Sequence, residues 1–156
     1  MQAPKSLVFT VFLIRNNHIL LIGKCEENFE VHKNMTILPS TSNTTELAEF
    51  YSLGDVFLNL SESETFGKVS AEAISCGTPL IAFNSTANPE IVPKGAGVVI
   101  ETTDLKEILL AIDEIFSKDK SEYKEKCLEH AHNNFDKEKN IQKYLGIYKK
   151  ILEKKR

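Results

Sequence analysis

The stretch SESETFGKVSAEAISCGTPLIA, residues Ser61 to Ala82, decides the fold of this chain. The run DVFLNL before it, Asp55 to Leu60, is apolar and β-branched and then turns polar, which is typical of a buried parallel strand at its C-terminal end. A helix is predicted next, with apolar residues at Val69, Ala71, Ala73 and Ile74. Gly77 stands where a helix C′ residue is expected, and Thr78-Pro79 begins the next extended run. The stretch therefore predicts a strand, a polar loop, a helix and a second strand.

Two carboxylates, Glu64 and Glu72, lie on either side of the predicted loop-to-helix junction. The ligand crevice of an open α/β sheet lies outside the carboxyl ends of its strands, and a helix N-terminus there offers N–H groups to phosphate. Gly67 allows an anion to approach the backbone closely. The pattern suits a diphosphate on the helix end, with Glu72 at a ribose and Glu64 at a hexose. The alternative is that both glutamates are solvated, since acids are common in first turns.

The wider pattern resembles the signature of retaining nucleotide-sugar glycosyltransferases of the GT-B fold, family four. The matching residues are Glu64-Thr65-Phe66-Gly67 and the run EAISCGTPLIA, residues 72–82. ELAEFYSLGDVF at 46–57, NPEIV at 88–92 and GVVI at 97–100 extend the match. The resemblance covers roughly residues 18 to 153. One departure is Asn84–Asn88, which replaces a glycine-rich segment whose backbone approaches the donor sugar in that family.

The resemblance implies a site for a nucleotide-sugar donor, UDP- or GDP-linked. Sugar binding and catalysis fall to Glu64, Thr65, Phe66 and Gly67, diphosphate binding to Gly67, Lys68 and Val69, and ribose binding to Glu72. For Lys68 a solvated side chain is the alternative. No metal or other cofactor is expected, because fixed N–H dipoles and cations can stabilise a departing diphosphate.

Length and composition limit the possible fold classes and functions. The 156 residues suit one domain, 1–156, and the net charge of −3 gives no sign of a nucleic-acid partner. Strands alternate with helices, so we expect a single Rossmann-like α/β domain with a mostly parallel sheet of five to six strands and flanking helices. A GxGxxG fingerprint, a P-loop and a GxSxG elbow are absent from the sequence, which argues against NAD(P), P-loop and serine-hydrolase chemistry.

The N-terminal segment gives two conflicting signals. Residues 7–14 are apolar and rich in β-branched and aromatic side chains, which predicts a buried strand. The resemblance instead favours a helix over 6–14, with Lys5-Ser6-Leu7 as the remnant of a diphosphate-binding turn. The first strand of the family is central to its sheet, and residues 7–14 are the only segment that can fill that place. We therefore predict a strand.

Four further expectations concern helices. Thr44 or Thr45 is expected to cap the helix that ends at Leu53. Asp104 to Glu107 has the D-x-x-E form of an N-terminal cap, so Asp104 is expected to cap a helix. This helix is expected to bury Leu105, Ile108, Leu109, Ile112, Ile115 and Phe116. His130 and His132 are two residues apart and point away from one another on a helix, so they do not predict a metal pair. Both are expected to be exposed. The last helix has an apolar stripe, from Ile141 to Leu152, that we expect to be only partly covered.

The compartment is inferred from the cysteines. Cys25, Cys76 and Cys127 are odd in number and widely spaced, so they predict neither a disulfide framework nor a metal site and fit a reducing cytoplasm. No run approaches the ~18 apolar residues of a membrane span. The basic C-terminal residues are typical of a solvated helix face, and weak association with an anionic membrane surface is the alternative.

Together these observations predict the donor-binding half of a retaining hexosyltransferase of polysaccharide or glycolipid synthesis. The acceptor-binding N-terminal domain is missing from the pattern, and so is the family's opening strand of the donor-binding half, with the arginine and lysine that grip the diphosphate. We therefore expect an isolated or truncated domain. Such a chain would bind donor weakly and transfer nothing without that domain or a partner subunit. The alternatives are a non-catalytic nucleotide-sugar-binding or assembly module and a fragment of a GT-B-like sugar-nucleotide epimerase.

Overall fold

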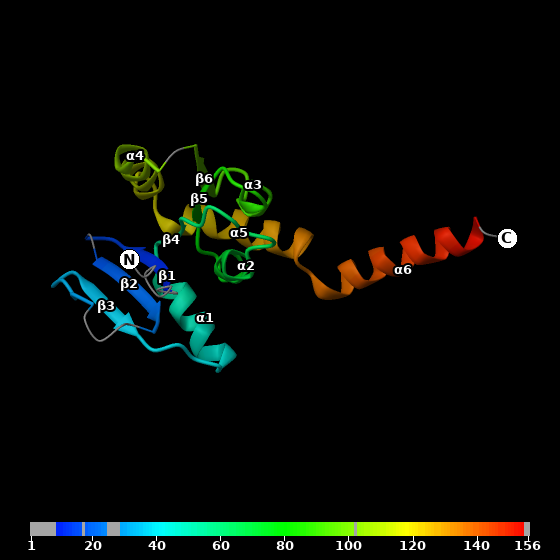
Figure 1. The fold of residues 1–156 in the computed structure, drawn as a ribbon, viewed down its shortest axis with the longest axis horizontal. Helices are drawn as coiled ribbons and strands as arrows, with labels where there is room; N and C mark the ends of the chain where they lie inside the picture. The colour runs from blue at the N-terminus through cyan, green and yellow to red at the C-terminus, as the bar shows by residue number, and fades with distance from the viewer. Residues whose placement is uncertain (1–8, 17, 25–28, 102, 155–156) are drawn as a thin grey trace, which may run out of the picture.

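The structure is a computed structural model that describes residues 9–16, 18–24, 29–101 and 103–154 (Figure 1). It contains a six-stranded sheet with flanking helices. The elements in chain order are β1 (Phe9–Ile14), β2 (His18–Gly23), β3 (Met35–Leu38), α1 (Thr44–Leu53), β4 (Val56–Asn59), α2 (Lys68–Ser75), β5 (Leu80–Phe83), α3 (Asn88–Ile91), β6 (Gly97–Ile100), α4 (Leu105–Phe116), α5 (Lys120–Asn134) and α6 (Lys137–Glu153).

The sheet has the strand order β3-β2-β1-β4-β5-β6. The pairs β2–β3, β4–β5 and β5–β6 are parallel. β1 is antiparallel to both of its neighbours, β2 and β4, so the other five strands all run in one direction. Figure 1 shows α4 on one side of the sheet and α1, α2 and α3 on the other. The prediction of an α/β fold with a mostly parallel sheet is confirmed.

β1 occupies the centre of the sheet. The local strand prediction is confirmed for residues 9–14, and the helix that the resemblance favoured is wrong for them. The physical reason is the tight turn at Arg15-Asn16, where Asn16 has φ 72, because a hairpin returns the chain directly to β2 as an antiparallel neighbour. The proposed turn remnant, Lys5-Ser6-Leu7, lies outside the described residues.

The core lies between the sheet and the helices α1, α2, α4 and α5. All four residues of β5 are buried, as expected of a strand covered on both faces. Phe12 of β1 is fully buried and packs on Phe57 of β4 and Tyr51 of α1, with ring centroids 5.0 Å and 5.5 Å apart. β1 therefore links α1 to the middle of the sheet.

Two helix predictions are wrong in detail. The residue that caps α1 is Asn43, not Thr44 or Thr45, because its side-chain oxygen accepts from the N–H groups of Thr45 and Glu46. In α4 the Asp104 cap is confirmed, but Leu105 and Leu109 are exposed. α4 buries Ala111 and Ile115, and Leu109 lies on almost the opposite side of the helix from Ala111.

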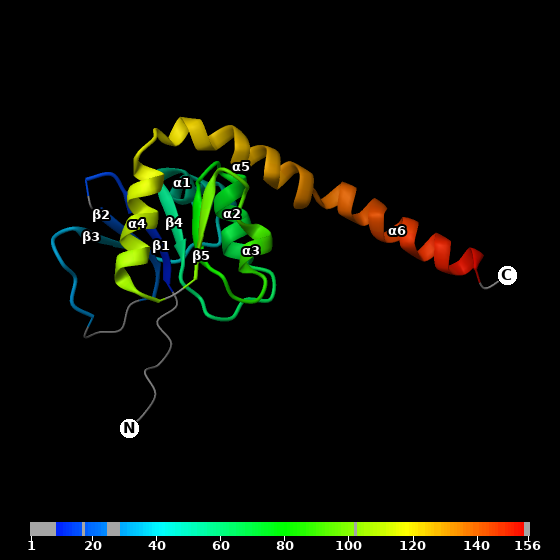
Figure 2. The ribbon, with the colours of Figure 1, turned by 90° about the horizontal axis from the view of Figure 1, so that it is seen from above.

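The last helix, α6, projects from the body of the molecule (Figure 2). None of its 17 residues is buried, so the stripe that we expected to be partly covered is largely open to solvent. Within the described residues, no helix combines the length and the apolar character needed to cross a membrane.

Candidate functional site

The candidate site is built around the start of α2. The loop 60–67 leads from β4 to Gly67, which has φ 72, and a Cβ there would lie 2.6 Å from Cδ1 of Ile91. Only glycine fits this turn without strain. No side chain caps α2, whereas α1, α4, α5 and α6 are capped by Asn43, Asp104, Asp119 and Asp136. The N–H groups of the first turn of α2 therefore remain available to an external anion.

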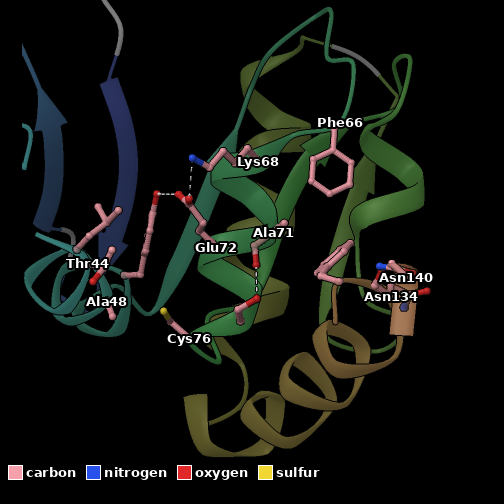
Figure 3. A pocket seen from close by; sticks show the side chains of 13 residues that line it. Thr44, Ala48, Phe66, Lys68, Ala71, Glu72, Cys76, Asn134 and Asn140 are labelled. Atoms are coloured by element: carbon pink, nitrogen blue, oxygen red, sulfur yellow. Dashed lines mark hydrogen bonds and ion pairs between the residues drawn. The ribbon is translucent and has the colours of Figure 1, made fainter. Parts of the chain in front are cut away.

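A pocket of about 450 Å³ follows the outer face of α2, between α1 and the junction of α5 and α6 (Figure 3). Its lining is mainly apolar with a few polar groups, and its volume lies in the range of small-molecule sites. The lining residues are Thr44, Leu47, Ala48, Tyr51, Phe66, Lys68, Ala71, Glu72, Ser75, Cys76, Asn134, Phe135 and Asn140. Of the sequence-predicted site residues, Phe66, Lys68 and Glu72 therefore line this α1–α2 pocket.

Glu72 is held by two neighbours in the α1–α2 pocket. The Tyr51 hydroxyl donates to its Oε2 at 2.7 Å, and Lys68 Nζ lies 3.5 Å from its Oε1. Figure 3 shows Glu72 and Lys68 on the side of α2 that faces α1. A carboxylate has about four lone-pair sites, so Glu72 can still accept from two ligand hydroxyls. Glu72 is thus oriented by the protein, whereas Lys68, with 83% of its side chain exposed, is solvated.

The Tyr51 hydroxyl is a strong fixed donor to Glu72. Burial raises its pKa, and its hydrogen bond to the Glu72 carboxylate raises that pKa further. The Tyr51 hydroxyl therefore stays protonated at neutral pH and acts as the hydrogen-bond donor to Glu72. Sequence reasoning missed this role, because Tyr51 lies 21 residues before Glu72 and on another helix.

Glu64 lies beside the same end of α2 but outside the lining of the α1–α2 pocket. Its N–H donates to Thr86 Oγ1 at 2.8 Å and its C=O accepts from the N–H of Ala87. A Cβ on Gly67 would lie 3.5 Å from Glu64 Oε2, so the carboxylate folds over the N-terminus of α2. Glu64 and Glu72 therefore flank the first turns of α2, and of the two only Glu72 lines the α1–α2 pocket. Thr65, Gly67 and Val69 also lie outside the pocket lining.

A buried amide network fixes the loop that carries Glu64. Asn88 is 1% exposed, and its amide donates to the Ser61 carbonyl at 3.0 Å. Asn59, at the end of β4, donates to Asn88 Oδ1 at 3.2 Å and to Ser70 Oγ at 2.9 Å. Sequence reasoning missed both asparagines. Their only signal was a polar residue at the end of a buried strand and another directly before a proline.

The segment Asn84–Asn88, which replaces the glycine-rich segment of the family, contains one residue with a strained backbone conformation. Thr86 has φ 45, in the left-handed region that few side chains adopt, and its hydroxyl accepts from the Glu64 N–H. Thr86 and Ala87 thus form hydrogen bonds with the Glu64 backbone. The absence of the glycines from the sequence did not predict these contacts.

The end of α5 closes the site on its other side. Phe66 packs edge-on against Phe135, with centroids 5.9 Å apart, and Phe135 in turn packs against His130 at 5.6 Å. His130 is half-buried, so the prediction of an exposed residue is wrong for it, although His132 is exposed. Burial lowers the pKa of His130, and a hydrogen bond to the Ile91 backbone opposes that shift.

The pKa of the Cys76 thiol depends on the charge of Glu72. Burial raises the pKa of the Cys76 thiol, and the Glu72 carboxylate raises it further, while Lys120 acts in the opposite direction. We expect Glu72→Gln to lower that pKa and so to speed the reaction of Cys76 with iodoacetamide at mildly alkaline pH. Mass spectrometry of the peptides gives the rate. Cys127 is the internal control, since it is fully buried and its pKa is raised to about 12. A rate for Cys76 that is unchanged or slower would contradict the assigned coupling.

Among the described residues, no three histidine, cysteine, aspartate or glutamate side chains are placed to hold a metal ion. The site itself offers hydrogen-bond groups and charges of three kinds. They are the uncapped N–H groups of α2, the carboxylates Glu64 and Glu72, and the ammonium of Lys68.

Comparison with known proteins identifies one family. The family model described as "Glycosyl transferases group 1" matches residues 22–134. N-acetyl-alpha-D-glucosaminyl L-malate synthase of Bacillus anthracis is 30% identical over 132 residues, which is 81% of this chain and 33% of that protein. An uncharacterized 41.2 kDa protein of the cps region of Klebsiella pneumoniae is 31% identical over 121 residues, 77% of this chain and 34% of that protein. The chain thus spans about a third of the length of these relatives.

Solved structures show the same fold. Anabaena HepE in complex with UDP superimposes with a TM-score of 0.65 at 19% identity, over 75% of this chain and 32% of that one. The complex of the same protein with UDP-glucose gives a TM-score of 0.63 at 18% identity, over 76% of this chain and 33% of that one.

Proposed function

Because this chain belongs to the group 1 glycosyl transferases, we propose that it is the part of a retaining hexosyltransferase that binds the nucleotide-sugar donor. One observation carries the proposal: a carboxylate, Glu72, is held by Tyr51 beside an uncapped helix N-terminus and an open pocket. That arrangement offers an acceptor for ribose hydroxyls within one or two helical turns of donors for phosphate. The UDP and UDP-glucose bound to Anabaena HepE support a uridine-linked donor.

In the proposed complex the diphosphate lies on the N–H groups at the start of α2. Gly67 permits close approach of the phosphate, and Lys68 adds a mobile positive charge. The donor's ribose hydroxyls donate to Glu72. The sugar hydroxyls donate to Glu64, whose carboxylate turns from Gly67 toward the ligand because it would otherwise repel the phosphate.

The proposed reaction breaks the bond between the anomeric carbon and the diphosphate oxygen. The electron pair leaves with the diphosphate, and its growing negative charge is stabilised by fixed N–H dipoles and by Lys68. Positive charge develops on the anomeric carbon, the acceptor hydroxyl oxygen bonds to that carbon, and the hydroxyl proton passes to the departing diphosphate. We propose that no metal is needed, so donor affinity is expected to be the same with magnesium and with EDTA.

The proposed product is a polysaccharide or a glycolipid, made in a reducing cytoplasm that keeps Cys76 and Cys127 free. Because the chain spans only 33–34% of the length of the two relatives described above, we propose that transfer also needs an acceptor-binding domain or partner subunit. The chain alone is expected to bind donor and to give no turnover. Release of glucose from UDP-glucose by this chain alone would contradict that expectation.

Calorimetry with UDP-, GDP- and ADP-glucose tests the proposal. One of the three is expected to bind at a single site, with the others weaker, and the same affinity is expected after addition of EDTA. Absence of binding by all three at millimolar concentration would contradict a donor-binding role. A non-catalytic nucleotide-sugar-binding module would also pass this test. It would fail to support transfer when the chain is mixed with a separately produced acceptor-binding domain.

A further inference from the structure

A second pocket, of about 220 Å³, lies between α5 and the turn that leads into β6. All of the residues that line this α5–β6 pocket are polar or charged: Lys94 of the turn, and Lys126, Glu129, His130, Asn133 and Asn134 of α5. Two lysines and one glutamate give the lining one net positive charge when the histidine is neutral. The volume is below the usual range of pockets for drug-sized ligands, so the pocket suits a small anion.

His130 has a ring nitrogen that lacks a partner. Within the described part of the chain, its Nε2 is the one buried side-chain nitrogen or oxygen without a hydrogen bond. The ring packs against Phe135 and lines the α5–β6 pocket. A buried polar atom without a partner costs free energy, and a ligand that supplies the missing hydrogen bond recovers it. His130 therefore favours a polar ligand in this pocket.

The two lysines of the α5–β6 pocket determine the charge of that ligand. Neither Lys94 nor Lys126 forms an ion pair with another residue that the structure describes. Lys126 Nζ donates to the Gly95 carbonyl at 3.2 Å, which places its ammonium over the turn that carries Lys94. An ammonium has three donor hydrogens, so Lys126 still has two for a ligand. The two ammonium charges exceed the single opposing charge of Glu129, and the pocket therefore favours an anion.

We propose that the α5–β6 pocket binds a phosphate group, either free or on a small phosphomonoester. Its oxygens would accept hydrogen bonds from Lys94 and Lys126, and one of them would share a proton with His130 Nε2. A phosphate group suits His130 because its second pKa is near 6, close to that of imidazole, so one proton is available for this bond near neutral pH. The Asn133 amide offers a further donor.

The α5–β6 pocket is separate from the proposed donor site. Asn134 is the one described residue that lines both this pocket and the α1–α2 pocket. The inference therefore does not depend on the proposed function. Phosphate can also bond to the N–H groups at the start of α2, and the amide resonances of residues 64–72 report that binding separately.

An NMR titration of the full chain with inorganic phosphate, at constant ionic strength, tests the proposal. The amides of residues 94–97 and 126–134 are expected to shift with one common dissociation constant. Phosphate is also expected to raise the pKa of His130, because the bound anion favours the charged imidazole. His18 and His32 are internal controls whose titration should not change. Glycerol phosphate identifies the source: tighter binding than inorganic phosphate assigns an ester, and equal or weaker binding assigns free phosphate.

Variants of the lining residues separate this site from general attraction to lysines. Lys94→Gln with Lys126→Gln is expected to weaken phosphate binding on the order of 100-fold, since each hydrogen bond to a charged group contributes about a tenfold factor. His130→Phe keeps an aromatic ring beside Phe135 and is expected to weaken binding about tenfold.

The matched control is Lys106→Gln with Lys137→Gln, which removes two exposed lysines outside the α5–β6 pocket and should bind phosphate like the wild type. Four results would overturn the proposal. They are shifts confined to residues 64–72, no shift at any residue, a pKa of His130 that phosphate does not raise, and equal loss of binding in the control.

Discussion

Replacing Phe12 by alanine is expected to lower the free energy of unfolding by about 3–5 kcal/mol. Phe12 is 0% exposed at the centre of the sheet, and its ring contacts Phe57 and Tyr51. A Cβ on Gly54 would lie only 2.4 Å from Phe12 Cδ1, so the surrounding core is packed tightly around the ring. Removing the ring leaves a cavity that such a core cannot easily close. Urea unfolding followed by circular dichroism gives the value.

The matched control for Phe12 is Leu110, which is 68% exposed on α4. Leu110→Ala is expected to change the free energy of unfolding by less than about 0.5 kcal/mol. Equal losses for the two variants would mean that β1 does not hold the centre of the sheet. The test matters for function because Phe12 also packs on Tyr51, the residue that orients Glu72.

The second large effect is expected at Glu72. Glu72→Ala should weaken the binding of both UDP and UDP-glucose about 10- to 100-fold, since hydrogen bonds to a charged group contribute about 1.5–3 kcal/mol. Both ligands carry the ribose, so both should lose affinity to the same extent. Titration calorimetry measures the two dissociation constants. An unchanged affinity for UDP would remove the ribose role from Glu72.

A Glu64 variant is expected to affect the binding of UDP-glucose and of UDP differently. If it accepts hydrogen bonds from the hexose, Glu64→Ala should weaken UDP-glucose about tenfold and leave UDP unchanged or slightly tighter. The slight gain follows because a carboxylate beside the diphosphate is removed. Glu62→Ala, two residues earlier and exposed, is the control and should alter neither ligand. Equal losses for UDP and UDP-glucose would show that Glu64 does not contact the sugar.

Local sequence signals accounted for most of the elements. Gly77, with φ 81, follows the end of α2 as its C′ position required, and Asp104 caps α4 as expected. The strand over 9–14 followed from its β-branched and aromatic residues, although a family pattern favoured a helix there. Each of these features depends on a few neighbouring residues, so each could be predicted from them.

The contacts that shape the site join distant residues. Tyr51 and Glu72 are 21 residues apart, and Asn59 and Asn88 are 29 apart. Their pairing depends on how α1 and α2 pack and on which strands are neighbours. It therefore cannot be predicted from the spacing of these residues along the chain. The same limit explains Leu105 and Leu109, whose helical periodicity was correct but whose side of α4 faces solvent.

The most direct test of the donor-binding claim is an amide NMR titration of the 156-residue chain with UDP-glucose. The amides of residues 64–72 are expected to shift most, because the diphosphate would bond to the N–H groups at the start of α2 and the two carboxylates would hold the sugar hydroxyls. Residues of α6 beyond Asn140 should not shift. If saturating UDP-glucose leaves the amides of residues 64–72 unmoved, the donor does not bind at α2 and the proposed function is contradicted.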